Sequence, residues 1–308
     1  MRDALRMRSR GPGAQATLIL VTIIWGLNWP SARFGLQDFS PWVFRTISFG
    51  ASALVLLAIA KRRGISLHVE RGAARWHLAA AGLLSIGGFG VLAAFAQLAT
   101  TTSRTAICAY TMPIWATLLA RLFLGERLDA WRCGALLIGA GGLLVLFLPL
   151  LADALPVGAL YALGSAVSWA AGTVYLKWAR IAGHAITITA WQLVAGTAAV
   201  AIGLMLDGSE VGGEIRLSSL AGLLYSTFVG TALAYLLWFQ SVSRLPASTA
   251  GLGTLLVPVI GVAASMLLLG DRPTGSDLIG FGLIFVAAVC ALFASTANQQ
   301  ASLIEGKS

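Results

Sequence analysis

Long stretches without a charged residue constrain the fold of this chain more than any other feature. The stretches 156–176, 183–206, 217–243, 245–270 and 278–304 contain no Asp, Glu, Lys or Arg. A helix rises about 1.5 Å per residue, so roughly 20 apolar residues cross the hydrocarbon core of a bilayer. The core offers the backbone no water, so spanning segments are helices or strands of a closed barrel. Barrel strands alternate apolar and polar residues, and these stretches do not, which predicts a polytopic all-α membrane protein.

The composition agrees with this class and argues against several others. The chain is 58% hydrophobic and 11% charged, whereas soluble domains carry about 25% charged residues. The net charge of +9 does not indicate nucleic-acid binding, because the cations flank the apolar stretches and set membrane topology there. Cys108, Cys133 and Cys290 have neither paired spacing nor a nearby His, so we expect no metal site and no disulfide framework.

We expect ten membrane spans joined by short loops. Their ranges are 14–34, 41–60, 75–97, 103–123, 131–151, 155–178, 184–206, 217–239, 246–269 and 276–297. Most of the 21 Lys and Arg residues fall in cytoplasmic segments if the N-terminus lies inside the cell. The positive-inside rule therefore predicts that both termini are cytoplasmic. The basic first residues resemble a signal peptide, but no clear cleavage site follows, so we expect a retained first span.

The stretch that begins at Pro113 occurs a second time in altered form. Pro113 precedes an apolar run that ends in Leu-Gly-Glu-Arg at Arg127, and a glycine-rich run follows. Pro258 precedes, at the same spacing, an apolar run that ends in Leu-Gly-Asp-Arg at Arg272. This match predicts an internal duplication of the chain.

Each copy would hold five spans, an odd number, so the two copies are expected to lie upside down relative to each other. The expected division is a basic cytoplasmic tail at 1–13, a first repeat at 14–152, a second, inverted repeat at 153–297 and a cytoplasmic tail at 298–308. Inverted repeats are typical of transporters that alternate access around a central site near the bilayer midplane. The duplication therefore favours a transporter with a central cavity.

These motifs carry a family resemblance over residues 16–297. The Trp25-Gly26-Leu27-Asn28-Trp29 motif, the Pro113 stretch with Gly125-Glu126-Arg127, and its second copy are similar to the EamA-type families of the drug/metabolite transporter superfamily. The resemblance implies ten helices in two inverted repeats and export of small metabolites. Amino-acid exporters, including an aromatic amino-acid exporter, belong to these families. Pro273 departs from the family pattern and suits a sharp turn before the last span.

Polar and aromatic residues in the middle of the expected spans are the candidates for a substrate site. They are Trp25 and Asn28, Phe89, Tyr110, Ser165, Trp169 and Thr173, Thr231 and Tyr235, and Thr254. Trp25 and Trp169 could face the cavity or a neighbouring helix, and Ser and Thr often bond to their own helix backbone. Asn28 needs a partner, which could be a helix, water or substrate.

The expected spans also contain residues with a mainly structural interpretation. Pro30, Pro113 and Pro258 each remove a helical N–H and predict kinks that could serve in gating. Glycines in span five predict close packing against span ten; they are Gly139, Gly141 and Gly142. Tryptophans near span ends predict interfacial belts; they are Trp42, Trp76, Trp131, Trp178 and Trp238.

Three charged residues near span ends have two interpretations each. Arg45 is expected to extend its guanidinium to the outer surface, and attraction of a carboxylate is the alternative. Glu126 and Asp271 are expected to end helices and form surface ion pairs, and coupling of transport to protons is the alternative.

No Asp or Glu lies in the middle of an expected span. An intramembrane carboxylate is the expected element of a proton relay or an organic-cation site, so its absence favours a neutral or zwitterionic substrate. The sequence also lacks a phosphate-binding loop and a nucleophile–base pair. We therefore expect no cofactor and no enzymatic activity, and facilitated diffusion is the simplest driving force.

We expect a monomeric exporter of small metabolites in a cell inner membrane. Its partners would be a small-molecule substrate and the lipid bilayer, without nucleic acid. Amino acids, aromatic or otherwise neutral, are the first substrates expected, and sugars, nucleosides or drugs are the alternative. A lipid-modifying membrane enzyme is the alternative from another class, and it would need a polar catalytic cluster that the sequence lacks.

Overall fold

The computed structural model describes residues 12–70, 72–126, 130–151, 157–208, 213–242, 256–287 and 289–290. Within these ranges the regular elements are helices, without a strand. Six helical runs there are long and apolar enough to cross a membrane, and shorter apolar helices accompany them. The predicted class, an all-α multi-pass membrane protein, is therefore confirmed. The number of ten spans and their inverted arrangement stay predictions.

The first part of the chain forms long helices, one of which contains a π-helical segment and another of which is interrupted. The elements are α2 (Pro12–Gly35), α3 (Pro41–Arg62), α4 (Ala73–Gly82), η1 (Leu83–Gly88), α5 (Phe89–Ala99), α6 (Thr102–Ala109), α7 (Met112–Leu124) and α8 (Ala130–Leu151). Residues 73–99 form one continuous helical run in which η1 is a π-helical segment. Tyr110 and Thr111 separate α6 from α7, and Pro113 occupies the first turn of α7. A proline there loses no helical hydrogen bond, because the first N–H groups of a helix have no partner in it.

The second part of the chain contains a similar series. The elements are α9 (Val157–Ala179), α10 (Ala185–Asp207), α11 (Leu217–Leu224), η2 (Tyr225–Leu233), α12 (Ala234–Val242), α14 (Leu256–Leu269) and an apolar helix at Gly275–Ala287. The segment η2 is again π-helical and lies between α11 and α12. Pro258 is the third residue of α14, whereas Pro30 lies inside the continuous helix α2.

Local sequence signals explain several helix ends. Ser40 caps α3, where its Oγ accepts a hydrogen bond from the Val43 N–H at 3.3 Å, and Pro41 begins the helix. Thr101 caps α6 in the same way through the Arg104 N–H. Gly125 ends α7 with a φ of 68°, a left-handed conformation that glycine adopts without steric cost.

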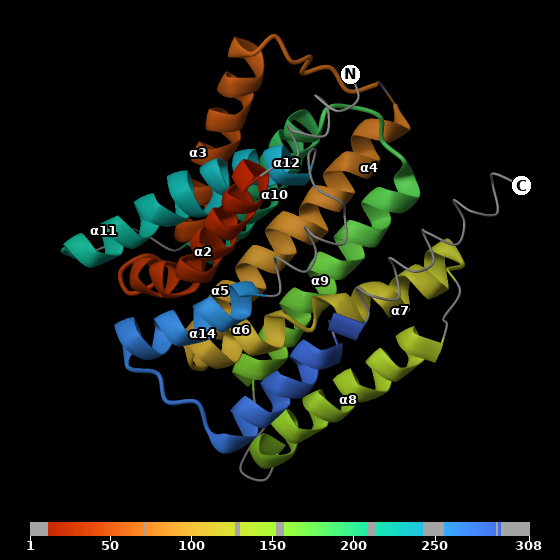
Figure 1. Ribbon diagram of the computed structural model, residues 1–308. Helices are drawn as coiled ribbons and strands as arrows, with labels where there is room; N and C mark the ends of the chain where they lie inside the picture. Colours follow the sequence, from red (N-terminus) through yellow and green to blue (C-terminus); the bar gives the residue numbers. More distant parts are fainter. Residues whose placement is uncertain are drawn as a thin grey trace, which may run out of the picture.

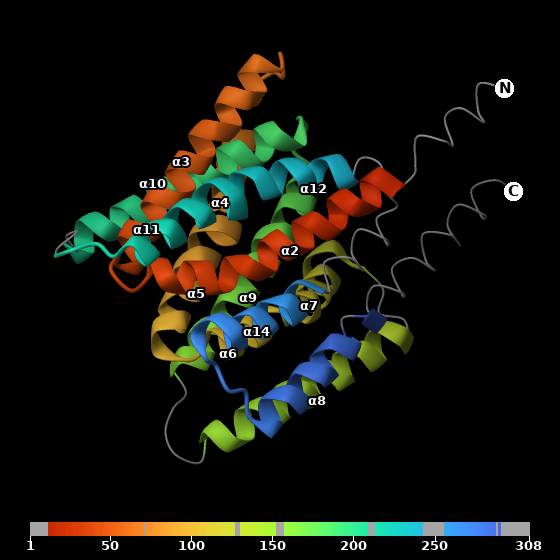
Figure 2. The same ribbon diagram turned by 60° about the vertical axis from the view of Figure 1, so that its left-hand side comes forward.

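The helices pack in two groups around α2 and α9. Helix α2 contacts α11, η2, α12 and α14, whereas α9 contacts α4, η1, α5, α6 and α7. Helices α3 and α10 lie side by side across the bundle from the pair formed by α8 and Gly275–Ala287 (Figures 1 and 2). We call one end of the bundle the α5–α6 end; α2 and α5 finish there, and α6 begins there. We call the end at which α7 and α9 finish the α7–α9 end.

Glycine contacts bring α8 against the helix Gly275–Ala287. A Cβ added at Gly142 would lie 2.9 Å from the backbone oxygen of Gly280, and one at Gly139 would lie 3.3 Å from the Ala287 Cβ. A Cβ added at Gly141 would meet no atom within 4 Å. The predicted packing of these two helices is therefore present at Gly142 and Gly139, and the prediction for Gly141 is wrong because it lies on another face of α8.

Candidate functional site

Helix α2 carries two tryptophans on one face. Trp25 and Trp29 are four residues apart, which places them one turn apart on the same side of the helix. The helix holds this position because Gly26 allows close contact with α14, where an added Cβ would lie 2.5 Å from Ile260 Cγ2. Each of the two tryptophans belongs to one of two neighbouring groups of aromatic residues.

The first group is the Trp29 cluster, at the junction of α2, α5, α6 and α7. Its members are Trp29, Phe89, Ala93, Ala106, Ala109, Tyr110 and Met112. The rings of Trp29 and Tyr110 have centroids 6.4 Å apart, within the range of favourable aromatic pairs. Tyr110 lies where the helix is interrupted between α6 and α7. The predicted residues Phe89 and Tyr110 are therefore brought together, with Trp29 as their common neighbour.

The second group is the Trp25 cluster, formed by Trp25, Tyr235 and Trp238. The ring of Trp25 lies 6.1 Å from that of Tyr235, edge to face, and 5.5 Å from that of Trp238. Tyr235 and Trp238 belong to α12, so this cluster joins α2 to the second part of the chain. Trp238, which was expected in an interfacial belt, packs against the candidate site residue Trp25.

Asn28 lies at the crossing of α2 with η2. A Cβ added at Gly230 would lie 2.2 Å from the Asn28 Oδ1, so only glycine leaves room for the amide. The Oδ1 atom is buried and has no hydrogen-bond partner among the described residues. Leaving a buried polar group without a partner costs roughly 1–3 kcal/mol. The amide is thus an available acceptor next to both aromatic clusters.

The hydroxyl candidates bond within their own helices. Ser165 donates to the Ala162 backbone oxygen at 2.6 Å, Thr173 to that of Trp169 at 2.9 Å and Thr231 to that of Ser226 at 2.8 Å. Ser165 and Thr231 are buried, whereas Thr173 is exposed on the same face of α9 as the half-buried Trp169. Thr254 lies outside the described residues.

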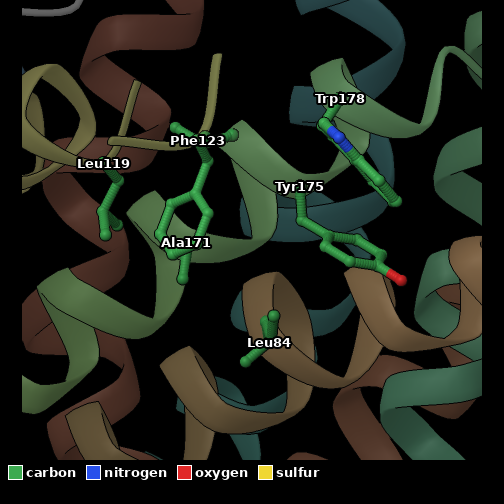
Figure 3. Close-up of a pocket in the computed structure, with 7 residues that line it drawn as sticks. Leu84, Leu119, Phe123, Ala171, Tyr175 and Trp178 are labelled. Carbon is green, nitrogen blue, oxygen red and sulfur yellow. The ribbon is translucent and has the colours of Figure 1, made fainter. Parts of the chain in front are cut away.

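An apolar pocket of about 290 Å³ lies near the α7–α9 end. Its lining residues are Leu84, Leu119, Phe123, Ala171, Val174, Tyr175 and Trp178 (Figure 3). They come from η1, α7 and α9. Tyr175 Oη lies 2.7 Å from His77 Nδ1, which fixes the ring at one side of the pocket. None of the predicted site residues lines it, because Trp169 and Thr173 lie on the opposite face of α9.

The acidic residues of the repeated motif have different partners. Glu126 forms an ion pair with Lys177 of α9, with 2.5 Å between Oε1 and Nζ. Asp271 accepts a hydrogen bond from the Ser103 N–H at 2.7 Å. Glu126 thus forms a surface ion pair as expected, but Asp271 has no ion-pair partner within the described part of the chain.

Arg45 does not reach the surface, contrary to the expectation from the sequence. Its side chain is buried, and Nε donates to the Gly90 backbone oxygen at 2.9 Å. The guanidinium also lies 5.0 Å from the ring centre of Phe44 and 5.4 Å from that of Phe49. These contacts with α5 and two aromatic rings hold the cation inside the protein, so it cannot extend outward.

Other contacts between helices have little or no sequence signal. Ser168 donates to the Leu84 backbone oxygen in η1 at 2.7 Å, and Ser52 donates to that of Thr227 in η2 at 2.8 Å. A π-helical segment has no recognisable residue pattern, so these partners could not be predicted. The place of Trp29 in the site could have been found from its spacing of four residues from Trp25.

Comparison with known proteins gives the family and fold. The model of the EamA-like transporter family matches this chain twice, at residues 14–148 and 156–293. A solved structure titled "Crystal structure of protein" has the same fold, with a TM-score of 0.62, 23% identity and coverage of 90% of this chain and 95% of its own.

Relatives of similar length are also transporters by name. The chain is 26% identical to the uncharacterized transporter YoaV of Bacillus subtilis, over 91% of this chain and 95% of that protein. It is 26% identical to the probable amino-acid metabolite efflux pump of Escherichia coli, over 92% of this chain and 96% of the pump. The two family matches together span most of the chain, and this protein therefore belongs to the EamA-like transporter family.

Proposed function

We propose that this protein exports neutral amino acids, including aromatic ones, by alternating access around the Trp25 and Trp29 clusters. The observation that carries the proposal is the position of α2, which presents two tryptophans and an unpartnered amide to aromatic residues of both parts of the chain. Aromatic faces suit apolar side chains, and an amide oxygen suits a substrate ammonium group.

The proposed arrangement is a pair of inverted five-helix repeats. Its support is the double match to one family model, together with a π-helical segment in the third helical run of each part, η1 and η2. The helix contacts also correspond: α9 contacts α5 and α7, as α2 contacts α12 and α14. Inverted repeats place the substrate site where the two repeats meet, and contacts between Trp25 and α12 lie at such a junction.

The support for export of amino acids comes from the names of two related proteins. The two efflux pumps, of Escherichia coli and Salmonella typhimurium, are each 26% identical to this chain and carry the name "probable amino-acid metabolite efflux pump". We further propose a monomer in a cell inner membrane with both termini cytoplasmic, on the basis of the Lys and Arg distribution. In this orientation the α5–α6 end faces outward.

The experiment is flux of radiolabelled phenylalanine and leucine in proteoliposomes, with and without an imposed pH gradient. Wild type is expected to move both solutes without a gradient, and unlabelled sugars and nucleosides should not compete. Trp25→Ala removes the ring that contacts Tyr235 and Trp238 and should raise KM for phenylalanine roughly tenfold.

Trp42→Ala is the matched control, because Trp42 packs against Phe95 and Gly203, away from both clusters. It should leave KM near the wild-type value. Flux of a labelled sugar or nucleoside, with no flux of either amino acid, would replace the proposed substrate class. Flux that needs a pH gradient would contradict facilitated diffusion. Equal effects of Trp25→Ala and Trp42→Ala would contradict the proposed site.

A further inference from the structure

Three polar side chains lie next to the Trp29 cluster, one helical turn toward the α5–α6 end. We call Arg33, Gln97 and Thr102 the polar layer. Residues four apart share a helix face, and each residue of the layer is four positions from a member of the cluster. The corresponding members are Trp29 for Arg33, Ala93 for Gln97 and Ala106 for Thr102. Since these three members pack together, the polar layer covers the cluster on its α5–α6 side.

The polar layer is closed and incompletely hydrogen-bonded. Gln97 and Thr102 are 0% and 1% exposed. Neither the Oε1 and Nε2 atoms of Gln97 nor the Oγ1 of Thr102 has a hydrogen-bond partner in the described ranges. Arg33 Nη1 donates to the Gln97 backbone oxygen at 2.5 Å, and the described residues give Arg33 no acidic partner.

Buried polar atoms without partners destabilise a fold, and each one in a native protein calls for an explanation. A ligand that completes them is one such explanation. A guanidinium presents a fork of N–H donors that matches a carboxylate, and the Gln97 amide nitrogen and Thr102 hydroxyl add two more donors. The Arg33 guanidinium, the Gln97 Nε2 and the Thr102 hydroxyl are thus donors for a bound anion, whereas the Gln97 Oε1 only accepts and suits a donor such as an ammonium group.

We infer that the polar layer is a second contact point for substrate, which binds the carboxylate of an amino acid on its way out. The inference rests on the proposed function and narrows its substrate class to solutes with a free carboxylate and an apolar side chain. The Trp29 cluster, one turn away, would hold the side chain. When α2 separates from α5 and α6 at the α5–α6 end, the layer opens to receive the carboxylate.

The test compares phenylalanine with phenylalaninamide, which lacks the carboxylate, as substrates in proteoliposomes. Wild type should have a KM for the amide roughly tenfold above that for phenylalanine, as expected for loss of a charge-assisted contact. Gln97→Met and Thr102→Val remove the unpartnered polar atoms at similar volume. Each should raise KM for phenylalanine toward that for the amide and leave the amide's KM within about twofold of wild type.

Unfolding midpoints of the purified variants give the second readout. Gln97→Met and Thr102→Val should keep or raise the midpoint, because they remove buried polar atoms that have no partner. Thr105→Val is the matched control, since its buried hydroxyl donates to the Thr101 oxygen at 3.0 Å. It should lower the midpoint and preserve the ratio of the two KM values.

Three results would overturn the inference. An unchanged KM ratio in both Gln97→Met and Thr102→Val would mean that substrate does not touch the layer. A lower midpoint with equal loss of flux for both solutes would assign Gln97 a structural role. Absence of amino-acid flux in wild type would instead contradict the proposed function, and the substrate class inferred for this layer would be wrong with it.

Discussion

Two of the ion pairs among the described residues, Arg104–Asp277 and Lys177–Glu126, should differ in strength by several-fold, and the structure allows the difference to be worked out. Arg104 of α6 donates from Nε and Nη2 to the two carboxylate oxygens of Asp277, at 2.9 and 2.8 Å. The Thr274 N–H and hydroxyl donate to the same carboxylate, both at 2.8 Å. The side chains of Arg104 and Asp277 are 20% and 5% exposed, whereas those of Lys177 and Glu126 are 67% and 31% exposed.

Burial and geometry set the expected magnitudes. Removing one partner of a buried pair costs about 3–5 kcal/mol, and the partial exposure of Arg104 lowers this, so we expect a coupling energy of about 2–3 kcal/mol. Exposed pairs contribute about 0–1 kcal/mol because water and salt screen them. Arg104→Ala should be more costly than Asp277→Ala, since it leaves the more deeply buried of the two charges without its partner.

Double-mutant cycles measure both couplings. Single and double alanine variants of each pair are unfolded at equilibrium in mixed detergent micelles, with tryptophan fluorescence as the signal. High salt should reduce the Lys177–Glu126 coupling and leave that of Arg104–Asp277 largely intact. Equal coupling energies for the two pairs, or the same salt dependence, would refute the assignment of strength from burial.

Two further predictions concern packing and pH. Gly142→Ala should lower the unfolding free energy by about 1–3 kcal/mol, because its Cβ would meet a backbone oxygen of the neighbouring helix, whereas Gly141→Ala should be neutral or stabilising. An equal effect of both in equilibrium unfolding would contradict this packing. Hydrogen bonds from Arg216 hold the pKa of Asp38 below its ordinary value of 3.8. Because the pKa is lowered in the folded state, the pair stabilises the fold above pH 3.8, and this stabilisation is lost as pH falls from 3.8 through the lowered pKa. The unfolding free energy of Asp38→Asn should therefore lie below that of wild type at pH 6, and the difference should shrink as pH falls below 3.8.

The helical membrane class could be predicted because it depends on the lack of charge along whole spans. The family could be predicted because its motif occurs twice in the sequence. Long uncharged stretches and two copies of one motif are visible without knowing any contact. The expected location of Arg45 was wrong because its side chain direction depends on Gly90 and Phe49, which approach only after the helices pack. Sequence position places a residue in a span and leaves its neighbours undetermined.

In the candidate site, too, the sequence indicated which residues lie in the spans but not all of their contacts. Trp25, Asn28, Phe89, Tyr110 and Tyr235 lie in or beside the two aromatic clusters, and their roles in binding stay predictions. The apolar pocket between η1, α7 and α9 was not expected, because it arises from the spacing of helix surfaces. The polar layer was also not expected, since Gln97 and Thr102 lie near span ends, where polar residues normally reach water.

The π-helical segment η1 carries a consequence for how this chain tolerates changes in length. An α-helix turns about 100° per residue, so removing one residue from a helix rotates all that follows. The segment η1 is an exception, because a π-helical turn, with its i→i+5 bonds, holds about one residue more than an α-helical turn. Deletion of Ile86 should therefore let the run 73–99 wind as a regular α-helix and keep the face that carries Phe89 and Gln97 toward α2. Deletion of a residue between Phe89 and Gln97 should instead turn Gln97 away from the face that Phe89 occupies, so η1 tolerates the loss of one residue better than the regular turns of α5.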